Sequence, residues 1–202
     1  LKGIRTQARL TLLIDGTPAA EEVGELLLTD YGVSGVCVFQ LSREAAPALA
    51  QGRSVRLAVN FLPEIPSLLP WLDARIRQLA PASLLALTTG VLPRLLAQTV
   101  IREARLSPDM PAEALSESEK QALCGALSAF PLVVTGTQGF ANAQVTRGGV
   151  SLADVNPSTL ASRLFDGLHI IGELLDVDGP CGGYNLHFAF AGALAAAKAI
   201  AG

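Results

Sequence analysis

Side chains able to do chemistry are scarce in this sequence, and its most distinctive stretch consists largely of glycine. Residues 179–185 read Gly-Pro-Cys-Gly-Gly-Tyr-Asn. The only histidines, His169 and His187, lie within apolar surroundings in the sequence, and no spacing suggests a Ser-His-Asp arrangement. We interpret both as structural. Neither a Gly-x-Gly-x-x-Gly motif nor a P-loop occurs. The sequence therefore names no catalytic residue, and a function of the glycine stretch would have to rest on its backbone.

Gly182 and Gly183 directly precede an apolar stretch typical of a helix. Two glycines at a helix start let a flat ligand approach the main chain, and the free amides there favour a group that is anionic or becomes so. The acidic residues of 173–178 could belong to the same site. The alternative is a tight turn with solvated acids, and spacing alone does not choose between the two.

Composition restricts the class of protein. Half of the 202 residues are hydrophobic and 16% are charged, which is typical of a globular chain. The net charge of −3, without any basic run, argues against nucleic acid as a partner. Cys37, Cys124 and Cys181 are odd in number and widely spaced, which fits neither a disulfide framework nor a zinc site. We therefore expect no metal and a cytoplasmic protein.

The first part of the chain has the pattern of strands. Residues 8–14 alternate loosely and end at the turn Asp15-Gly16, residues 25–39 mix short apolar runs with glycine, and residues 54–60 alternate again. We predict that residues 1–62 form a small β-rich unit.

A helical region follows. Leucines recur at helical spacing over 68–79 and over 84–100, where Pro93 interrupts the pattern. The sequence from Ser116 to Glu119 is a capping box and predicts a third helix that runs toward Phe130.

The end of the chain returns to strand patterns at 132–135 and 143–146, and then shows a strand at 167–172, a loop at 173–183 and a helix at 184–201. The last helix is apolar or small on nearly every side, so we expect both of its faces to be covered. It carries Lys198 and is shorter than the roughly 20 residues that span a bilayer, so we expect no membrane association. A strand, a glycine-rich turn and a helix are how α/β folds present a helix N-terminus to a ligand.

Residues 167–186 closely resemble the C-terminal FAD-binding signature of the BaiN/YhiN-like flavoproteins, also called the aminoacetone oxidase family of FAD-binding enzymes. The most specific parts are Gly-Glu-x-x-Asp-Val at 172–177 and Gly-Gly-Tyr-Asn at 182–185. Weaker likenesses at 32–35, 92–96 and 139–150 extend the resemblance over nearly the whole chain.

The resemblance implies an α+β fold. Residues 1–145 would be an inserted β-barrel-like domain with a helical subdomain at about 66–130. Residues 146–202 would be the C-terminal strand-loop-helix segment of a Rossmann-like FAD-binding domain. The N-terminal half of that FAD-binding domain is absent from this sequence, so the chain looks like a fragment of a longer protein.

The resemblance also implies that the parent protein is an FAD-dependent oxidoreductase, and that the fragment alone is inactive and binds FAD weakly or not at all. Gly172 and Glu173 would lie beside the ribityl chain, with Asp176 as a weaker candidate. Main-chain amides would face the pyrimidine edge of the isoalloxazine at Gly182, Gly183, Tyr184, Asn185 and Leu186. The expected partners are a small-molecule substrate and the missing N-terminal half, and the family pattern allows NAD(P) as electron donor.

A different class of function stays open at this point. The leucine-rich region 68–100 holds more apolar surface than a small lid needs, which would suit a non-catalytic substrate-binding module or a homodimer surface. We interpret Cys181 as a small residue in a tight turn rather than a redox group, and Arg147 as solvated rather than bound to a phosphate.

Overall fold

The chain folds into two units, Leu1–Gly136 and Thr137–Gly202, in a computed structural model that describes all of residues 1–202. The first unit combines an antiparallel sheet with five of the six α-helices, and the second holds the sixth. The predicted α+β class is confirmed.

An antiparallel sheet organises the first unit. Its neighbouring strands follow the order β3-β2-β1-β4-β5, and their bounds are β1 (Arg5–Ile14), β2 (Thr17–Leu28), β3 (Val33–Ser34), β4 (Val55–Asn60) and β5 (Phe130–Val133). Side chains alternate between the faces of a strand, and every second residue of β1 from Ala8 to Ile14 is buried. The predicted strand at 8–14 and its turn at Asp15-Gly16 are confirmed.

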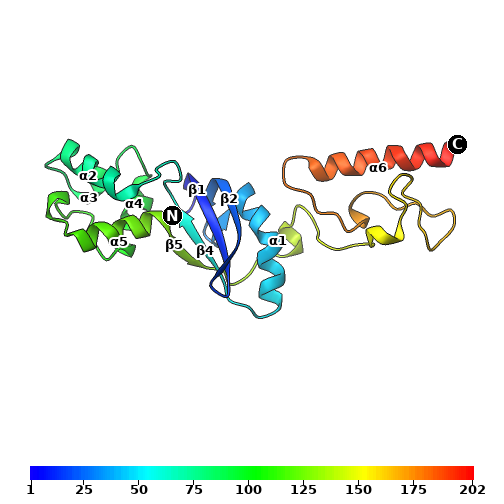
Figure 1. The fold of residues 1–202 in the computed structure, drawn as a ribbon, viewed down its shortest axis with the longest axis horizontal. Coiled ribbons are helices and arrows are strands. Elements are labelled where there is room, and N and C mark those ends of the chain that lie inside the picture. The colour runs from blue at the N-terminus through cyan, green and yellow to red at the C-terminus, as the bar shows by residue number, and fades with distance from the viewer. The chain divides into compact units, whose positions relative to one another are not determined.

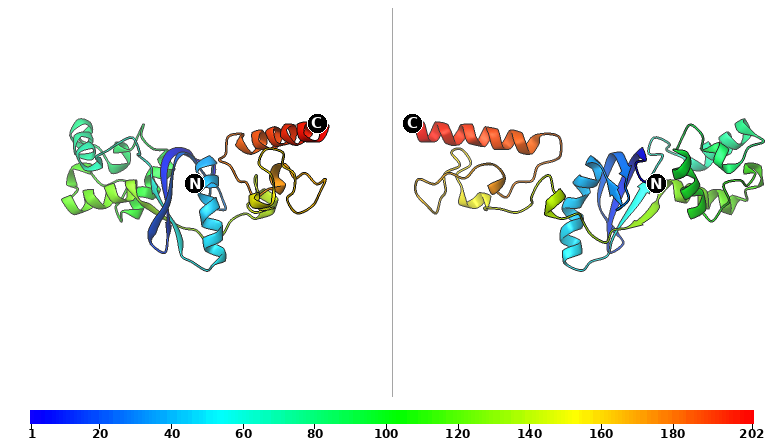
Figure 2. Two further views of the ribbon diagram at one scale, coloured as in Figure 1. Left: turned by 45° about the vertical axis from the view of Figure 1, so that its right-hand side comes forward. Right: turned by 180° about the vertical axis from the view of Figure 1, so that it is seen from behind.

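A helix that the sequence did not reveal covers one face of this sheet (Figures 1 and 2). This helix, α1 (Val36–Ala50), lies where we expected only β structure. It packs through Cys37, Leu41, Ala45 and Ala48. Three of these four residues are small, and Pro47 lies inside the helix, so the helical period was weak in the sequence. Gly35 is the N-cap residue of this helix and has φ 118°, and a Cβ atom there would overlap the carbonyl oxygen of Glu25.

Four helices form the rest of the first unit, namely α2 (Leu68–Leu79), α3 (Leu84–Leu87), α4 (Arg94–Glu103) and α5 (Glu117–Ser128). The predicted helix at 68–79 is confirmed, and so is the capping box. The Glu119 amide donates to Ser116 Oγ at 3.3 Å, and the Ser116 amide donates to Glu119 Oε2 at 2.8 Å. The single helix expected over 84–100 is wrong. The chain leaves the helix after α3, and Pro93, which has no amide hydrogen, occupies the N-cap position of α4.

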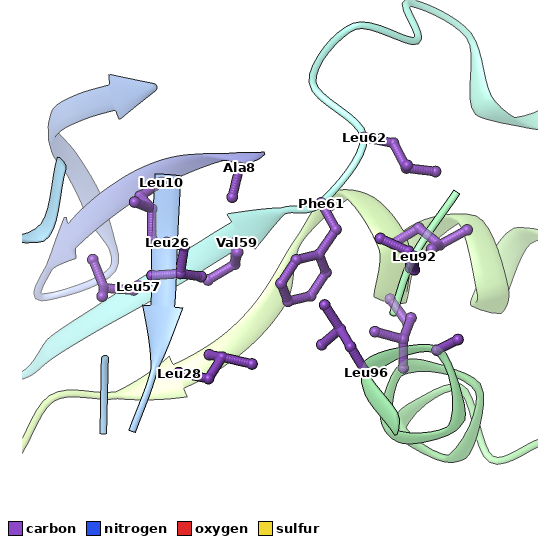
Figure 3. Packing of buried hydrophobic residues seen from close by; sticks show 14 of the residues in the cluster. Ala8, Leu10, Leu26, Leu28, Leu57, Val59, Phe61, Leu62, Leu92 and Leu96 are labelled. Carbon is purple, nitrogen blue, oxygen red and sulfur yellow. The ribbon is translucent and has the colours of Figure 1, made fainter. Parts of the chain in front are cut away.

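One hydrophobic core runs from the sheet into the helices. Figure 3 shows Phe61, which follows β4, pointing between the residues of the sheet and Leu92 and Leu96 of the helical part. The Phe61 ring also meets Phe130 edge-on, with the ring centroids 5.6 Å apart. Most of the leucines that suggested an assembly surface are buried in this core, and only Leu79 and Leu95 of that region are exposed. The leucine-rich pattern of 68–100, on which the dimer alternative was based, is therefore explained by the core of the first unit.

The second unit is mostly irregular backbone. It contains three short 3-10 turns, Phe140–Asn142, Leu152–Asp154 and Gly172–Leu174, before helix α6 (Tyr184–Ala201). The strands expected at 143–146 and 167–172 are wrong, because the first has no partner strand and the second makes a single bridge, between His169 and Ala161. The unit's core has four buried hydrophobic residues: Val155, Leu160, Leu175 and Ala196.

Helix α6 has the predicted bounds, but the expectation that both of its faces are covered is wrong. Gly192 and Ala196 are its buried residues. The opposite side carries Leu186, Phe190 and Leu194, which are 67%, 70% and 64% exposed. In Figures 1 and 2 the rest of the second unit lies along one side of α6. None of the helices has the length and apolar character needed to cross a membrane.

Candidate functional site in the glycine segment 172–186

The turn at Gly172 lies against helix α6. Gly172 is buried and has φ 64°, and a Cβ atom at this position would lie 3.5 Å from the Cβ atom of Ala189. Glu173, the next residue, is exposed. The fold therefore brings Gly172 and Glu173 beside the second turn of α6. The start of the same helix contains the predicted group of amides at residues 182–186.

The N-terminus of α6 has no side-chain cap. Gly183 occupies the N-cap position with φ 95° and ψ −5°, and the first turn contains no acidic residue. The first helical hydrogen bond joins the His187 amide to the Gly183 carbonyl at 2.9 Å. The amides of Tyr184, Asn185 and Leu186 precede it, so they lack an i−4 carbonyl and carry the partial positive charge of a helix start. Such a group of donors suits an anionic or electron-rich ligand edge.

The Asn185 side chain closes the glycine loop. The Gly179 amide donates to Asn185 Oδ1 at 2.7 Å, and Asn185 Nδ2 donates to the Gly179 carbonyl at 3.1 Å. A Cβ atom at position 179 would lie 3.2 Å from that Oδ1, so glycine leaves room for the contact. The sequence indicated only a main-chain role for Asn185, and the one available signal was the Gly-x5-Asn spacing.

The Asp176 side chain is engaged within its own unit. Its Oδ1 accepts a hydrogen bond from the Gly148 amide at 3.1 Å. Backbone bonds reinforce this contact, because the Val150 amide donates to the Leu174 carbonyl at 2.8 Å and the Asp176 amide donates to the Val150 carbonyl at 2.9 Å. A Cβ atom on Gly149 would lie 2.6 Å from the Leu174 carbonyl oxygen. Asp176 thus helps to hold residues 148–150 against residues 174–176.

Of the three cysteines, Cys37 and Cys124 lie in the first unit, whereas Cys181 lies within the glycine segment. None of the three cysteines forms a disulfide. Cys37 belongs to the first unit, where burial raises the pKa of its thiol and its Sγ donates to the Glu25 carbonyl at 3.4 Å. His187 is exposed in the first turn of α6, and His169 forms the bridge to Ala161.

A five-stranded antiparallel sheet packed with helices, followed in the chain by a small glycine-rich unit, defines an α+β protein. Comparison with known families narrows this class. The chain belongs to the family described as the HI0933-like protein barrel and H2TH domain, which matches residues 1–145. The resemblance to the BaiN/YhiN-like flavoproteins is thereby confirmed.

Three relatives of stated function are similar to the chain. A 3-dehydro-bile acid delta(4,6)-reductase from Clostridium scindens is 37% identical over 201 residues, which is 98% of this chain and 49% of the relative. A ribosomal RNA dihydrouridine synthase from Escherichia coli is 34% identical over 86% of this chain and 41% of the relative. The enzyme of the same name from Haemophilus influenzae is 29% identical over 87% of this chain and 42% of the relative. The chain thus spans about half the length of the first relative and less of the other two.

Proposed function

We propose that the chain is part of an FAD-dependent oxidoreductase and that segment 172–186 contacts the flavin. The observation that carries the proposal is the uncapped N-terminus of α6 beside the buried Gly172 turn. This arrangement occurs in a chain of which 98% aligns with a relative that is a reductase. FAD, when bound, supplies the hydride chemistry.

The residues of the segment have distinct proposed roles. Gly172 and Glu173 lie beside the ribityl chain, where the exposed Glu173 carboxylate accepts hydrogen bonds from hydroxyl groups. The amides at the start of α6 face the pyrimidine edge of the isoalloxazine, where negative charge accumulates on reduction. A helix N-terminus stabilises such charge by about 1 kcal/mol, which raises a two-electron potential by about 20 mV.

The other half of the cofactor site belongs to polypeptide that this chain does not contain. The relatives are about twice as long as the chain, and the second unit has only four buried hydrophobic residues in its core. The exposed side of α6, formed by Leu186, Phe190 and Leu194, is the surface that the FAD-binding half covers. That half also supplies the pyrophosphate-binding turn, since no phosphate-binding motif occurs in this sequence.

The proposed substrate is a small molecule, and the family pattern allows NAD(P) as the electron donor. The balance of 15 basic and 18 acidic residues gives no reason to prefer a nucleic acid. The cytoplasm remains the proposed compartment, in keeping with three cysteines that form no disulfide.

The experiment that tests the flavin assignment uses the full-length protein and a matched pair of glycine variants. Gly183 has φ 95° and Gly167 has φ 75°, and a Cβ atom would find no neighbour within 4 Å at either position. Both Gly→Ala changes therefore impose similar backbone strain, but only Gly183→Ala places a methyl group where the flavin approaches the main chain. We expect Gly183→Ala to weaken FAD binding at least tenfold more than Gly167→Ala. Full-length protein that purifies without flavin, or equal losses in the two variants, would contradict the proposal.

A further inference from the structure

We propose that Asp176 and Asn185 are positioning residues, whose side chains hold the glycine segment 172–186 in its binding shape before any ligand arrives. The identity of the ligand rests on the function proposed above. The two side-chain contacts are a property of the chain itself and are testable without the ligand.

The need for such contacts follows from the composition of the segment. Gly182 and Gly183 adopt φ 122° and 95°, and glycine loses more conformational freedom on ordering than any other residue. Hydrophobic packing restrains the segment at Leu175, which belongs to the unit's four-residue core, and at Val177, which packs against that core, but not in the glycine loop that follows. The shape of the segment therefore depends on hydrogen bonds.

The two side chains fasten the segment at separate points. Asn185 donates to and accepts from the backbone of Gly179, so residues 180–184 form a loop whose ends are tied together. Asp176 accepts from the amide of Gly148, which lies 28 residues earlier in the chain, and so ties the segment to irregular backbone outside it. The Asn185 contact uses the backbone of Gly179, where a Cβ atom would lie 3.2 Å from Asn185 Oδ1. The Asp176 contact uses the amide of the residue before Gly149, where a Cβ atom would lie 2.6 Å from the Leu174 carbonyl oxygen.

The consequence is preorganisation. A ligand that meets an ordered row of amides does not have to order the loop on binding, and the saved entropy appears as affinity. Asp176 then contributes through Gly148 rather than by direct contact with the ribityl chain. This assigns to Asp176 a role different from the one that the family resemblance implied.

The first test measures amide hydrogen exchange in the 202-residue chain without flavin. Asp176→Ala should speed exchange of the Gly148 amide, and Asn185→Ala that of the Gly179 amide, each about fivefold or more, as expected for loss of a protein hydrogen bond. Asp176→Asn keeps an oxygen acceptor and should restore protection of Gly148. Asn156→Ala is the matched control, because Asn156 Oδ1 accepts from the Ser158 amide at 2.9 Å outside the segment. Unchanged exchange at Gly148 and Gly179 in the two Ala variants would overturn the inference.

The second test measures the FAD dissociation constant of the full-length protein with the same substitutions. Asp176→Ala and Asn185→Ala should weaken binding by about the factor seen in exchange, whereas Asp176→Asn and Asn156→Ala should bind like the wild type. Equal losses for Asp176→Ala and Asp176→Asn would overturn the positioning role, because they would indicate direct contact by the charge. Faster exchange in a full-length protein that holds no flavin would support the two contacts and refute the proposed function.

Discussion

The exposed side of α6 allows a quantitative test of what covers it. Phe190 and Leu194 are 70% and 64% exposed in this chain. Full burial of such a side chain contributes about 1.5–3 kcal/mol, so covering the exposed two thirds of each contributes about 1–2 kcal/mol. The double variant Phe190→Ser with Leu194→Ser should therefore lower the unfolding free energy of the full-length protein by about 2–4 kcal/mol. In the 202-residue chain the same change should stay within about 0.5 kcal/mol, as for other surface substitutions.

Urea denaturation of both proteins, followed by circular dichroism, measures the difference. Leu95→Ser is the matched control, since Leu95 is 58% exposed on helix α4 of the first unit. It should have a small effect in both proteins. An equal effect of the double variant in the two proteins would refute the reasoning. If the 202-residue chain were a dimer and the double variant a monomer, the reasoning would also fail, because a second copy of the chain would then cover this side of α6.

Two further predictions concern the first unit. Gly35→Ala should lower the unfolding free energy measured in urea by about 2–4 kcal/mol, because the new Cβ atom overlaps the Glu25 carbonyl at a φ of 118°. The control Gly52→Ala, at φ 72° with open space around it, should lower it by only about 1 kcal/mol. Similar losses in the two variants would argue against the overlap. Hydrogen bonds from the Arg53 side chain at 2.7 Å and the Ser54 amide at 3.0 Å lower the pKa of Asp15. A lowered folded-state pKa adds stability that is present above the unfolded value of about 3.9 and is lost as the pH falls through the folded value. Asp15→Asn should therefore flatten the fall in melting temperature below about pH 4, and an unchanged slope would show that the contact contributes nothing.

The elements that the sequence predicted correctly depend on local signals. The capping box at Ser116 and the leucine spacing of 68–79 each act within a few turns of one helix. Helix α1 was missed because its buried side is mostly Cys37, Ala45 and Ala48, which resemble residues of a strand or a loop. The apolar character of α6 indicated what would be buried, but burial requires a partner surface, and the second unit supplies one on only one side.

The family resemblance located the candidate site, but it did not predict the hydrogen bonds that the site's own side chains form. The Gly148 to Asp176 contact joins residues far apart in the sequence, and no local pattern marks it. The Asn185 contact is closer, but the choice between a ligand-facing and a loop-closing side chain depends on the loop geometry. The sequence therefore predicts a flavin contact in this segment, with Asp176 as a weaker candidate, and the structure adds that Asp176 Oδ1 accepts from the Gly148 amide.

The unequal cores of the two units have a consequence for how the chain melts. The heat-capacity change of unfolding scales with the apolar area that becomes exposed, and nearly all of the buried apolar residues belong to the first unit. A calorimetric transition of this chain therefore reports the cooperative melting of the sheet and its helices. The glycine segment contributes little to that signal, so a variant can lose the order of the segment while its melting curve is unchanged.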